Sequence, residues 1–161
     1  MQLKFFFLAT LFLSFGNPSE KATQYFKDFY KNGKVKAEGW LENGQKIGYW
    51  KFYHQNSTVS AQGYYKNGKR EKYWYFYSSN KVRSMEGHYE KGKKTKWWLF
   101  YDKNGHINHK CQLSGGKKNG YCLQYLNEKL TSAEKYKNGK RIKKWTSYSG
   151  FRRENKLSDL R

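Results

Sequence analysis

Cys111 and Cys122 are the residues of this 161-residue sequence whose types and spacing most clearly suggest chemistry. They are its only cysteines, and they fall at positions that would face each other across one β-hairpin. A facing, non-hydrogen-bonded pair on antiparallel strands has a Cα separation of about 4.5 Å, which a disulfide can bridge. We therefore expect one structural disulfide between Cys111 and Cys122.

The histidines suggest another use for these cysteines, because His109 is expected on the same face and zinc binds such side chains. A fourth ligand is missing nearby, so we predict no metal and no cofactor. The acidic residues are scattered, with no recurring pair for acid–base catalysis. The stretch from Gly115 to Lys118 lacks the strand–loop–helix context of a phosphate-binding loop. We therefore predict no catalytic residues and a protein that is not an enzyme.

The elements that position these residues are repeats with a period of 24 residues and one slip to 23. Such a period is typical of repeat arrays, whose units bury their apolar surface only by stacking on their neighbours. We assign five repeats to residues 30–148. The period is seen in the series Gly44, Gly68, Gly92, Gly116, Gly139 and in the series Trp50, Trp74, Trp98, Cys122, Trp145.

Each repeat has the pattern of a β-hairpin. Between Val35 and Tyr53, two runs rich in aromatic and β-branched residues flank Asn43-Gly44, and Asn-Gly favours a tight reversal. Pro18 is the only proline, and no segment has a clear helical stripe. We predict an all-β fold, an elongated antiparallel β-meander of about eleven short strands in a single curled sheet. Residues 17–29 would form a lead-in strand, and residues 149–161 a tail or capping strand.

The strand register follows from placing Leu41 opposite Gly48 across a six-residue loop. Gly39 then faces Trp50, and Ala37 faces Phe52. The indole would lie over the bare glycine backbone and shield it from water. The same rule predicts the pairs Gly63–Trp74, Ala61–Phe76, Gly87–Trp98 and Met85–Phe100.

The alternation of side chains divides the aromatic residues between two faces. The Trp face would carry Trp50, Trp74, Trp98 and Trp145 with the phenylalanines, and we expect it to be the packed face. The opposite Tyr face would form an open, partly wet groove, because tyrosine combines a rigid ring with a polar tip. Its partner-binding tyrosine row comprises Tyr53, Tyr77, Tyr101, Tyr125 and Tyr148.

The basic residues gather at one of the two kinds of turn. Nine-residue windows at the five Gly44-type turns hold 16 Lys and Arg, against 7 at the alternate turns. Because alternate turns of a meander lie on opposite edges, one long edge is much more basic, although a merely solubilising role stays open. This basic edge comprises Lys66, Lys69, Arg70, Lys72, Lys91, Lys93, Lys94, Lys96, Lys137, Lys140, Arg141, Lys143 and Lys144.

The N-terminus has the pattern of a secretory signal peptide over residues 1–16. Lys4 precedes an apolar run from Phe5 to Phe15, with small residues before a break at Asn17. The alternative is an N-terminal strand or buried helix. The formal net charge is +21, and removing Lys4 with the peptide leaves +20. Such a charge favours anionic partners. We predict an exported protein, periplasmic or extracellular.

The repeat units resemble the bacterial variant of the MORN repeat. The units YKNGKVKAEGWLENGQKIGYWKF, YYKNGKREKYWYFY and EGHYEKGKKTKWWLFY carry this likeness, which covers about Tyr30 to Tyr148. It is the variant found in toxin–antitoxin system antitoxins of the YwqK type. The resemblance implies an elongated hairpin array that contacts protein or lipid, with no catalytic residues, and a role in neutralising a toxin by binding it.

We expect a non-enzymatic module that binds a partner protein, which the charge suggests is acidic, in an antitoxin-like or immunity-like role. The alternative is a scaffold that binds an anionic membrane surface or envelope polymer through the basic edge. Export argues against nucleic acid as the partner, and no small-molecule substrate is inferred.

Overall fold

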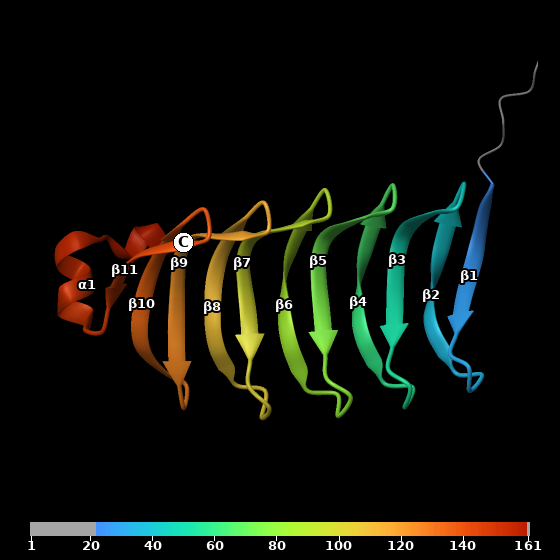
Figure 1. The fold of residues 1–161 in the computed structure, drawn as a ribbon, viewed down its shortest axis with the longest axis horizontal. Helices are drawn as coiled ribbons and strands as arrows, with labels where there is room; N and C mark the ends of the chain where they lie inside the picture. Colours follow the sequence, from blue (N-terminus) through green and yellow to red (C-terminus); the bar gives the residue numbers. More distant parts are fainter. Residues whose placement is uncertain (1–21, 161) are drawn as a thin grey trace, which may run out of the picture.

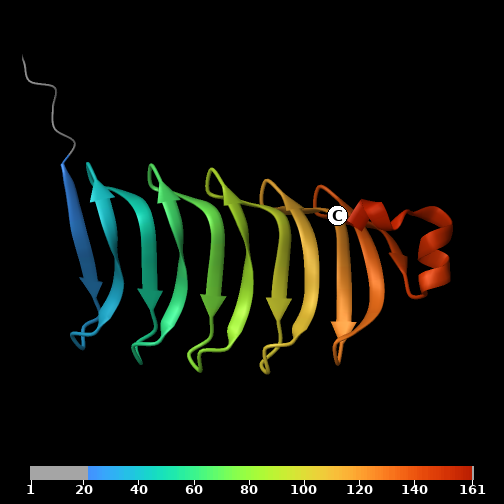
Figure 2. The ribbon, with the colours of Figure 1, turned by 180° about the vertical axis from the view of Figure 1, so that it is seen from behind.

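The computed structural model describes residues 22–160, which form one open, eleven-stranded antiparallel sheet followed by short helices. Each strand pairs only with its neighbours in sequence, so the sheet is a meander (Figures 1 and 2). The predicted fold is confirmed. The elements are β1 Thr23–Phe29, β2 Val35–Glu42, β3 Gln45–Tyr53, β4 Val59–Lys66, β5 Lys69–Tyr77, β6 Arg83–Glu90, β7 Lys93–Tyr101, β8 Ile107–Ser114, β9 Lys117–Leu126, β10 Lys129–Lys137, β11 Lys140–Trp145, α1 Tyr148–Glu154 and the 3₁₀ helix η1 Leu157–Leu160.

Tight two-residue turns connect each even-numbered strand to the next odd-numbered one, along the upper edge in Figure 1. In the first of them Asn43 and Gly44 have φ values of 49° and 77°, which Asn and Gly tolerate best. Each of the four later turns is also hydrogen-bonded to the preceding hairpin. The amide of Gly68 donates to the carbonyl of Lys46 (3.0 Å), and Gly116 repeats the bond to Lys94 (2.9 Å).

The register combines confirmed pairs with a feature that the sequence did not predict. Ala37 lies opposite Phe52 as expected, but Leu41 lies opposite Lys46 rather than Gly48. The predicted six-residue loop is therefore wrong. The shorter turn is compensated by a bulge, since Trp40 pairs with Ile47 whereas Glu38 pairs with Lys51. Gly87–Trp98, Met85–Phe100 and Ala61–Phe76 pair as predicted.

The bulge explains why a tryptophan recurs beside it. A bulge leaves backbone carbonyls without partners in the ladder, and buried carbonyls need a donor. Nε1 of Trp74 donates to the carbonyls of Tyr64 (3.1 Å) and Glu71 (3.2 Å), and Trp50 makes the equivalent pair of bonds. The indole N–H therefore supplies the hydrogen bonds that the backbone carbonyls lack where the bulge interrupts regular strand pairing.

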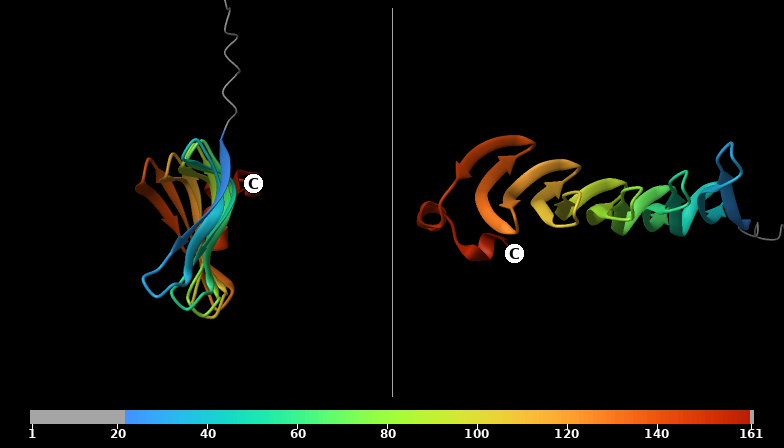
Figure 3. Two further views of the ribbon diagram at one scale, coloured as in Figure 1. Left: turned by 90° about the vertical axis from the view of Figure 1, so that its right-hand side faces the viewer. Right: turned by 90° about the horizontal axis from the view of Figure 1, so that it is seen from below.

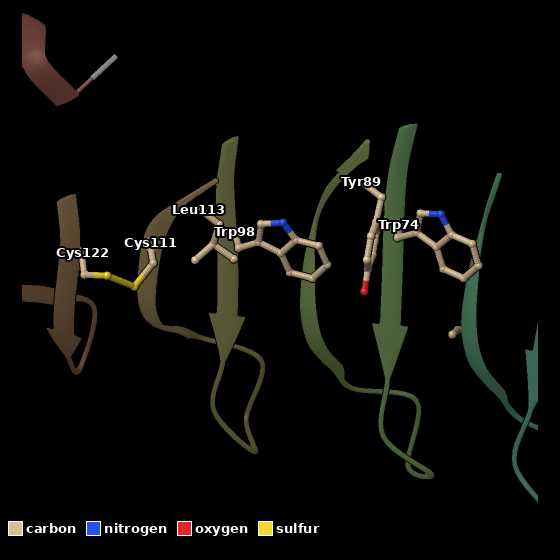
Figure 4. Close-up of a cluster of buried hydrophobic side chains, with 7 residues drawn as sticks. Trp74, Tyr89, Trp98, Cys111, Leu113 and Cys122 are labelled. Carbon is tan, nitrogen blue, oxygen red and sulfur yellow. A yellow bond between two sulfur atoms is a disulfide. The ribbon is translucent and has the colours of Figure 1, made fainter. Parts of the chain in front are cut away.

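The same indoles cover the glycines, which makes the Trp face the packed one. A Cβ added at Gly87 would lie 2.5 Å from Cδ2 of Trp98, and Gly39 and Gly63 are covered in the same way. The side chains of Trp50, Trp74 and Trp98 are fully buried. Phenylalanine and tyrosine rings pack against them, so the core of this single-layer sheet is built from aromatic side chains. Figure 4 shows Trp74, Tyr89 and Trp98 side by side in this core.

In the fourth repeat a disulfide replaces the glycine–tryptophan pair. Cys111 lies opposite Cys122 with a Cα separation of 4.0 Å, and the two are bonded and fully buried. The prediction from the sequence is confirmed. The bond lies in the same row as the indoles of Trp74 and Trp98 (Figure 4).

The C-terminal end departs from the prediction in two ways. Residues 149–161 were expected to form a tail or capping strand; the capping strand is wrong, because the described part of this segment contains most of α1 and all of η1. Trp145 was expected on the Trp face, but it packs with Tyr121, Leu123 and Phe151 on the Tyr face. Its strand has a shorter bulge: β11 contains one extra residue, whereas β3, β5, β7 and β9 each contain two. One residue fewer moves a side chain to the other face.

Helix α1 therefore covers the C-terminal end of the Tyr face. Phe151 is the buried residue of the helix, and Ser147 caps it by accepting a hydrogen bond from the Gly150 amide. Leu160 from η1 packs against the same cluster. Figure 3 shows the two helices at one end of the long, narrow array. The lead-in strand β1 lies at the other end.

Candidate binding surface

Three members of the tyrosine row, Tyr53, Tyr77 and Tyr101, lie on the Tyr face as predicted, but their hydroxyls already form hydrogen bonds. Tyr53 donates to Oε1 of Glu38 (2.5 Å), and Tyr101 donates to Oε1 of Glu86 (2.6 Å). Gln62, at the equivalent position of the intervening repeat, donates from Nε2 to the hydroxyl of Tyr77 (3.2 Å). These rings are half-buried, so the row is a fixed base of the surface rather than a set of free polar tips.

The hydrogen bond between Tyr53 and Glu38 changes the acidity of both groups. The Tyr53 hydroxyl holds the pKa of Glu38 below its usual range, with Lys27 adding to the effect and partial burial opposing it. Burial, followed by the hydrogen bond to Glu38, raises the pKa of Tyr53. In the third repeat, burial and nearby Glu86 raise the pKa of Tyr73 to about 12. The tyrosines are therefore neutral donors and Glu38 is an ionised acceptor at neutral pH.

Replacing Glu38 with glutamine should make the protein less sensitive to acid. Because the pKa of Glu38 is lower in the folded chain, its contribution is complete above the ordinary glutamate pKa of about 4.3 and is lost as the pH falls through the folded value. Urea unfolding of Glu38→Gln between about pH 6 and pH 3 should show a shallower loss of stability than wild type, with a cost of about 1 kcal/mol at pH 6. Gln62 shows that the position accepts an amide. An unchanged pH slope would contradict this role of Glu38.

Two members of the tyrosine row do not continue it. Tyr125 is half-buried and packs against the cluster beneath α1, with burial raising its pKa. Tyr148 begins α1 instead of lying on a strand, and 59% of its surface is exposed. The prediction that Tyr148 belongs to the row is wrong, because the last repeat ends in a helix.

A second aromatic row on the same face was missed. We call it the aromatic ladder: three pairs of rings that face each other across neighbouring strands at the bulges. The pairs have centroid separations of 5.3, 5.0 and 4.7 Å and meet edge to face. The 24-residue spacing of Tyr25, Tyr49 and Tyr73 was visible in the sequence, but the partner position varies in residue type. The ladder comprises Tyr25–Trp40, Tyr49–Tyr64 and Tyr73–His88.

The first two pairs of the ladder are exposed to solvent, and the third pair, Tyr73–His88, is half-buried. Tyr25 and Trp40 are 50% and 47% exposed, and Tyr49 and Tyr64 are 38% and 42% exposed. Its next position, Trp97, packs instead against the cluster under α1. The Tyr face is thus covered by the chain's own helices at its C-terminal end and carries exposed rings over β1–β4.

The basic edge runs beside this ladder and contains two kinds of cation. Arg70 and Lys94 are half-buried and lie over the indoles of Trp74 (4.5 Å) and Trp98 (4.1 Å), on the Trp face. Lys46, which was not assigned to the edge, takes the same place in the first repeat. Burial, and then the charge of Arg70, lower the pKa of Lys94. These cations therefore cover the tryptophans of the aromatic core.

The remaining basic-edge residues are exposed, and their pairing differs along the array. At the C-terminal end Arg141 and Lys144 approach Glu134 (3.0 and 3.9 Å), and Lys143 pairs with Glu154 (2.7 Å). Within residues 22–160 the other exposed members form no ion pair. They are Lys66, Lys69, Lys72, Lys91, Lys93, Lys96, Lys137 and Lys140.

The cysteines and histidines do not come together as a metal site. Both cysteines are bonded to each other, and His109 stacks on Phe100 with a centroid separation of 4.3 Å. Over residues 22–160 no cluster of three or more His, Cys, Asp or Glu side chains is arranged to hold a metal ion. The Tyr face and the basic edge present aromatic rings and cationic side chains to solvent.

The disulfide is typical of a non-reducing environment. The predicted signal peptide, residues 1–16, lies outside the described residues. Among the helices of the described chain, none has the length and apolar character needed to cross a membrane. Comparison with models of protein families and with curated proteins found no match to this chain.

Proposed function

We propose that this chain is an exported, non-enzymatic repeat module that binds an acidic partner protein across the exposed part of its Tyr face and the adjoining basic edge. The observation that carries the proposal is that two features adjoin each other: edge-to-face aromatic rings exposed on β1–β4, and exposed basic-edge lysines that form no ion pair within the described chain. Rigid aromatic rings supply contact area at low entropic cost, and complementary charge speeds association.

The C-terminal end of the same face supports this assignment. There the equivalent rings, Trp97 and Tyr121, are packed under Phe151 and Leu160. Aromatic rings of the Tyr face are therefore buried by α1 and η1 at the C-terminal end and exposed on β1–β4. Exposed aromatic patches rimmed by polar residues are typical of interaction sites. The basic edge favours a partner of opposite charge.

The resemblance to MORN-repeat antitoxins supports a neutralising role for the binding. In that role the partner would be a toxin, and the complex would block it by covering its surface. The disulfide supports export, so the role would be that of an immunity protein outside the reducing cytoplasm.

Charge reversal on the two edges tests the proposal. The double variant Lys69→Glu/Lys93→Glu changes two exposed basic-edge residues, and Lys31→Glu/Lys103→Glu makes the same change at exposed turns of the opposite edge. A partner captured from the exported fraction and then purified should bind the first variant at least about tenfold more weakly and the second like wild type. Equal affinities would contradict the proposal.

The second candidate is binding of the basic edge to an anionic membrane surface or envelope polymer. The exposed lysines on successive turns favour it, because hairpin repeats advance by about 10 Å and each turn adds cations to one line. Vesicles with and without anionic lipid separate the two. Binding to anionic vesicles could be lost in Lys69→Glu/Lys93→Glu and unaffected by substitution of the ladder rings. That result would favour a membrane surface over a protein as the partner.

A further inference from the structure

The aromatic ladder has a repeat distance that restricts what can lie along it. Each repeat contributes two strands, and antiparallel neighbours are about 4.8 Å apart, so successive ladder pairs are spaced by about 9.6 Å. The ladder crosses the strands, so a linear ligand that contacts every pair must run along the array axis. Such a ligand must present equivalent groups about every 9.6 Å on one side.

Among the conformations of a peptide, polyproline II fits this spacing. It has three residues per turn and a rise of about 3.1 Å, so its side chains return to the same side every ~9.3 Å. A β-strand covers a similar length with three residues, but its side chains alternate. Every second ladder pair would then face the wrong side of the strand.

The side chains of the ladder are suited to this ligand. Proline-rich helices dock on clusters of exposed aromatic rings, and polyproline II is largely preformed, so ordering it costs little entropy. The rings meet their partners at 75°, 71° and 89°, so no pair offers one flat platform for a planar group. Tyr49 and Tyr64 form the central pair and are both exposed.

Two lysines repeat with the ladder. Lys72 and Lys96 occupy equivalent bulge positions one repeat apart, and both are exposed with positive φ (62° and 60°). Lys72 Nζ lies 4.7 Å from the centre of the Tyr64 ring. Both line a surface hollow of about 440 Å³ that also includes Tyr73, His88 and the acidic residues Glu71 and Glu90. Acidic side chains at every third position of a polyproline II helix would meet these lysines in turn.

We propose that the ladder binds an extended acidic peptide segment in the polyproline II conformation, with proline against the ring pairs and an acidic residue at every third position. This inference rests on the proposed function and names the part of the partner that the Tyr face recognises. The contact surface runs from Tyr25 to His88 and is bordered by Lys72 and Lys96.

The test uses two fluorescein-labelled peptides of one composition and the oxidised chain that contains residues 22–160. One peptide repeats Pro-Pro-Glu about four times, and the other has the same residues shuffled so that the three-residue period is lost. Fluorescence anisotropy should show the periodic peptide binding about tenfold or more tightly than the shuffled one. Equal affinity of the two peptides would overturn the inference and leave only charge attraction.

Variants show whether the ladder is the site. Tyr49→Ala/Tyr64→Ala should abolish the preference for the periodic peptide, whereas Tyr148→Ala, which removes an exposed tyrosine outside the ladder, should not change it. Lys72→Glu keeps the rings and should weaken binding of the acidic peptide while sparing a Pro-Pro-Gln version. A preference that survives loss of both rings would overturn the assignment of the site.

The captured partner separates this inference from the proposed function. If the purified partner still depends on Tyr49 and Tyr64 but the periodic peptide neither binds nor competes with it, the inference fails and the proposed function stands. An acidic oligosaccharide or a single-stranded nucleic acid could compete with the partner for the ladder when the peptide does not. In that case the inference of a polyproline II peptide is also wrong. If the partner binds the ladder variants and the basic-edge variants as tightly as wild type, the proposed function fails.

Discussion

Replacing Gly63 with alanine should destabilise the protein by about 2–3 kcal/mol, against the usual direction for this change in a strand. Glycine in a strand interior normally costs stability relative to alanine. Here a Cβ would overlap the indole of Trp74, which is fully buried and held by two hydrogen bonds from Nε1. The ring cannot move aside without breaking those bonds and disturbing Tyr65 and Tyr89, which pack against it.

Chemical unfolding of three variants measures this effect. Gly87→Ala should repeat the loss, because Trp98 covers Gly87 in the next repeat. Ser60→Ala on the same strand as Gly63 is the control and should change the free energy of unfolding by less than about 0.5 kcal/mol. A Gly63→Ala protein as stable as wild type would show that the indole is not what requires glycine.

The double variant Cys111→Gly/Cys122→Trp, which introduces the glycine–tryptophan pair of the other repeats, should be more stable than either single variant. Cys111→Gly breaks the disulfide, which closes a short loop and contributes about 2–3 kcal/mol. Cys122→Trp breaks it too and places an indole against the Cys111 side chain. Cys111→Gly/Cys122→Trp recreates the arrangement of Gly87 and Trp98, so we expect the double variant to regain most of the loss.

The readout is a double-mutant cycle of unfolding free energies, with and without reductant. Wild type should lose stability on reduction, and the double variant should be unaffected. The coupling between the two substitutions should be about 2 kcal/mol in favour of the double variant. Additive losses would mean that the fourth repeat cannot accept the glycine–tryptophan pair.

The repeat period made most of the fold predictable. Positions that recur every 24 residues located the strands and the reversals between them, although the two-residue length of the tight turns was not predicted, and the joint change at Cys111 and Cys122 revealed the disulfide. The bulges were not predictable, because glycine, lysine and tyrosine all occur there and only the backbone shows the shift. For this reason Trp145 was placed on the wrong face. The bulge in β11 has one residue fewer, which leaves the spacing from Gly139 to Trp145 unchanged but moves the Trp145 side chain to the Tyr face.

The surface was predicted less completely than the fold. The basic edge follows from counting lysines at alternate turns, but the sequence does not show that Arg70 and Lys94 fold onto tryptophans. The tyrosine row was found by its constant residue type. The ladder was missed because its cross-strand partners are Trp40, Tyr64 and His88, which share a position but not an identity.

Hydroxyl-radical footprinting of the complex with the captured partner tests the central claim most directly, because it reports the exposure of individual side chains. The partner should protect Trp40, Tyr49 and Tyr64 from oxidation, while exposed Tyr148 on α1 should be modified as in the free chain. Protection of Tyr148 with the ladder rings still oxidised would contradict the central claim, because the partner would then bind elsewhere on the array.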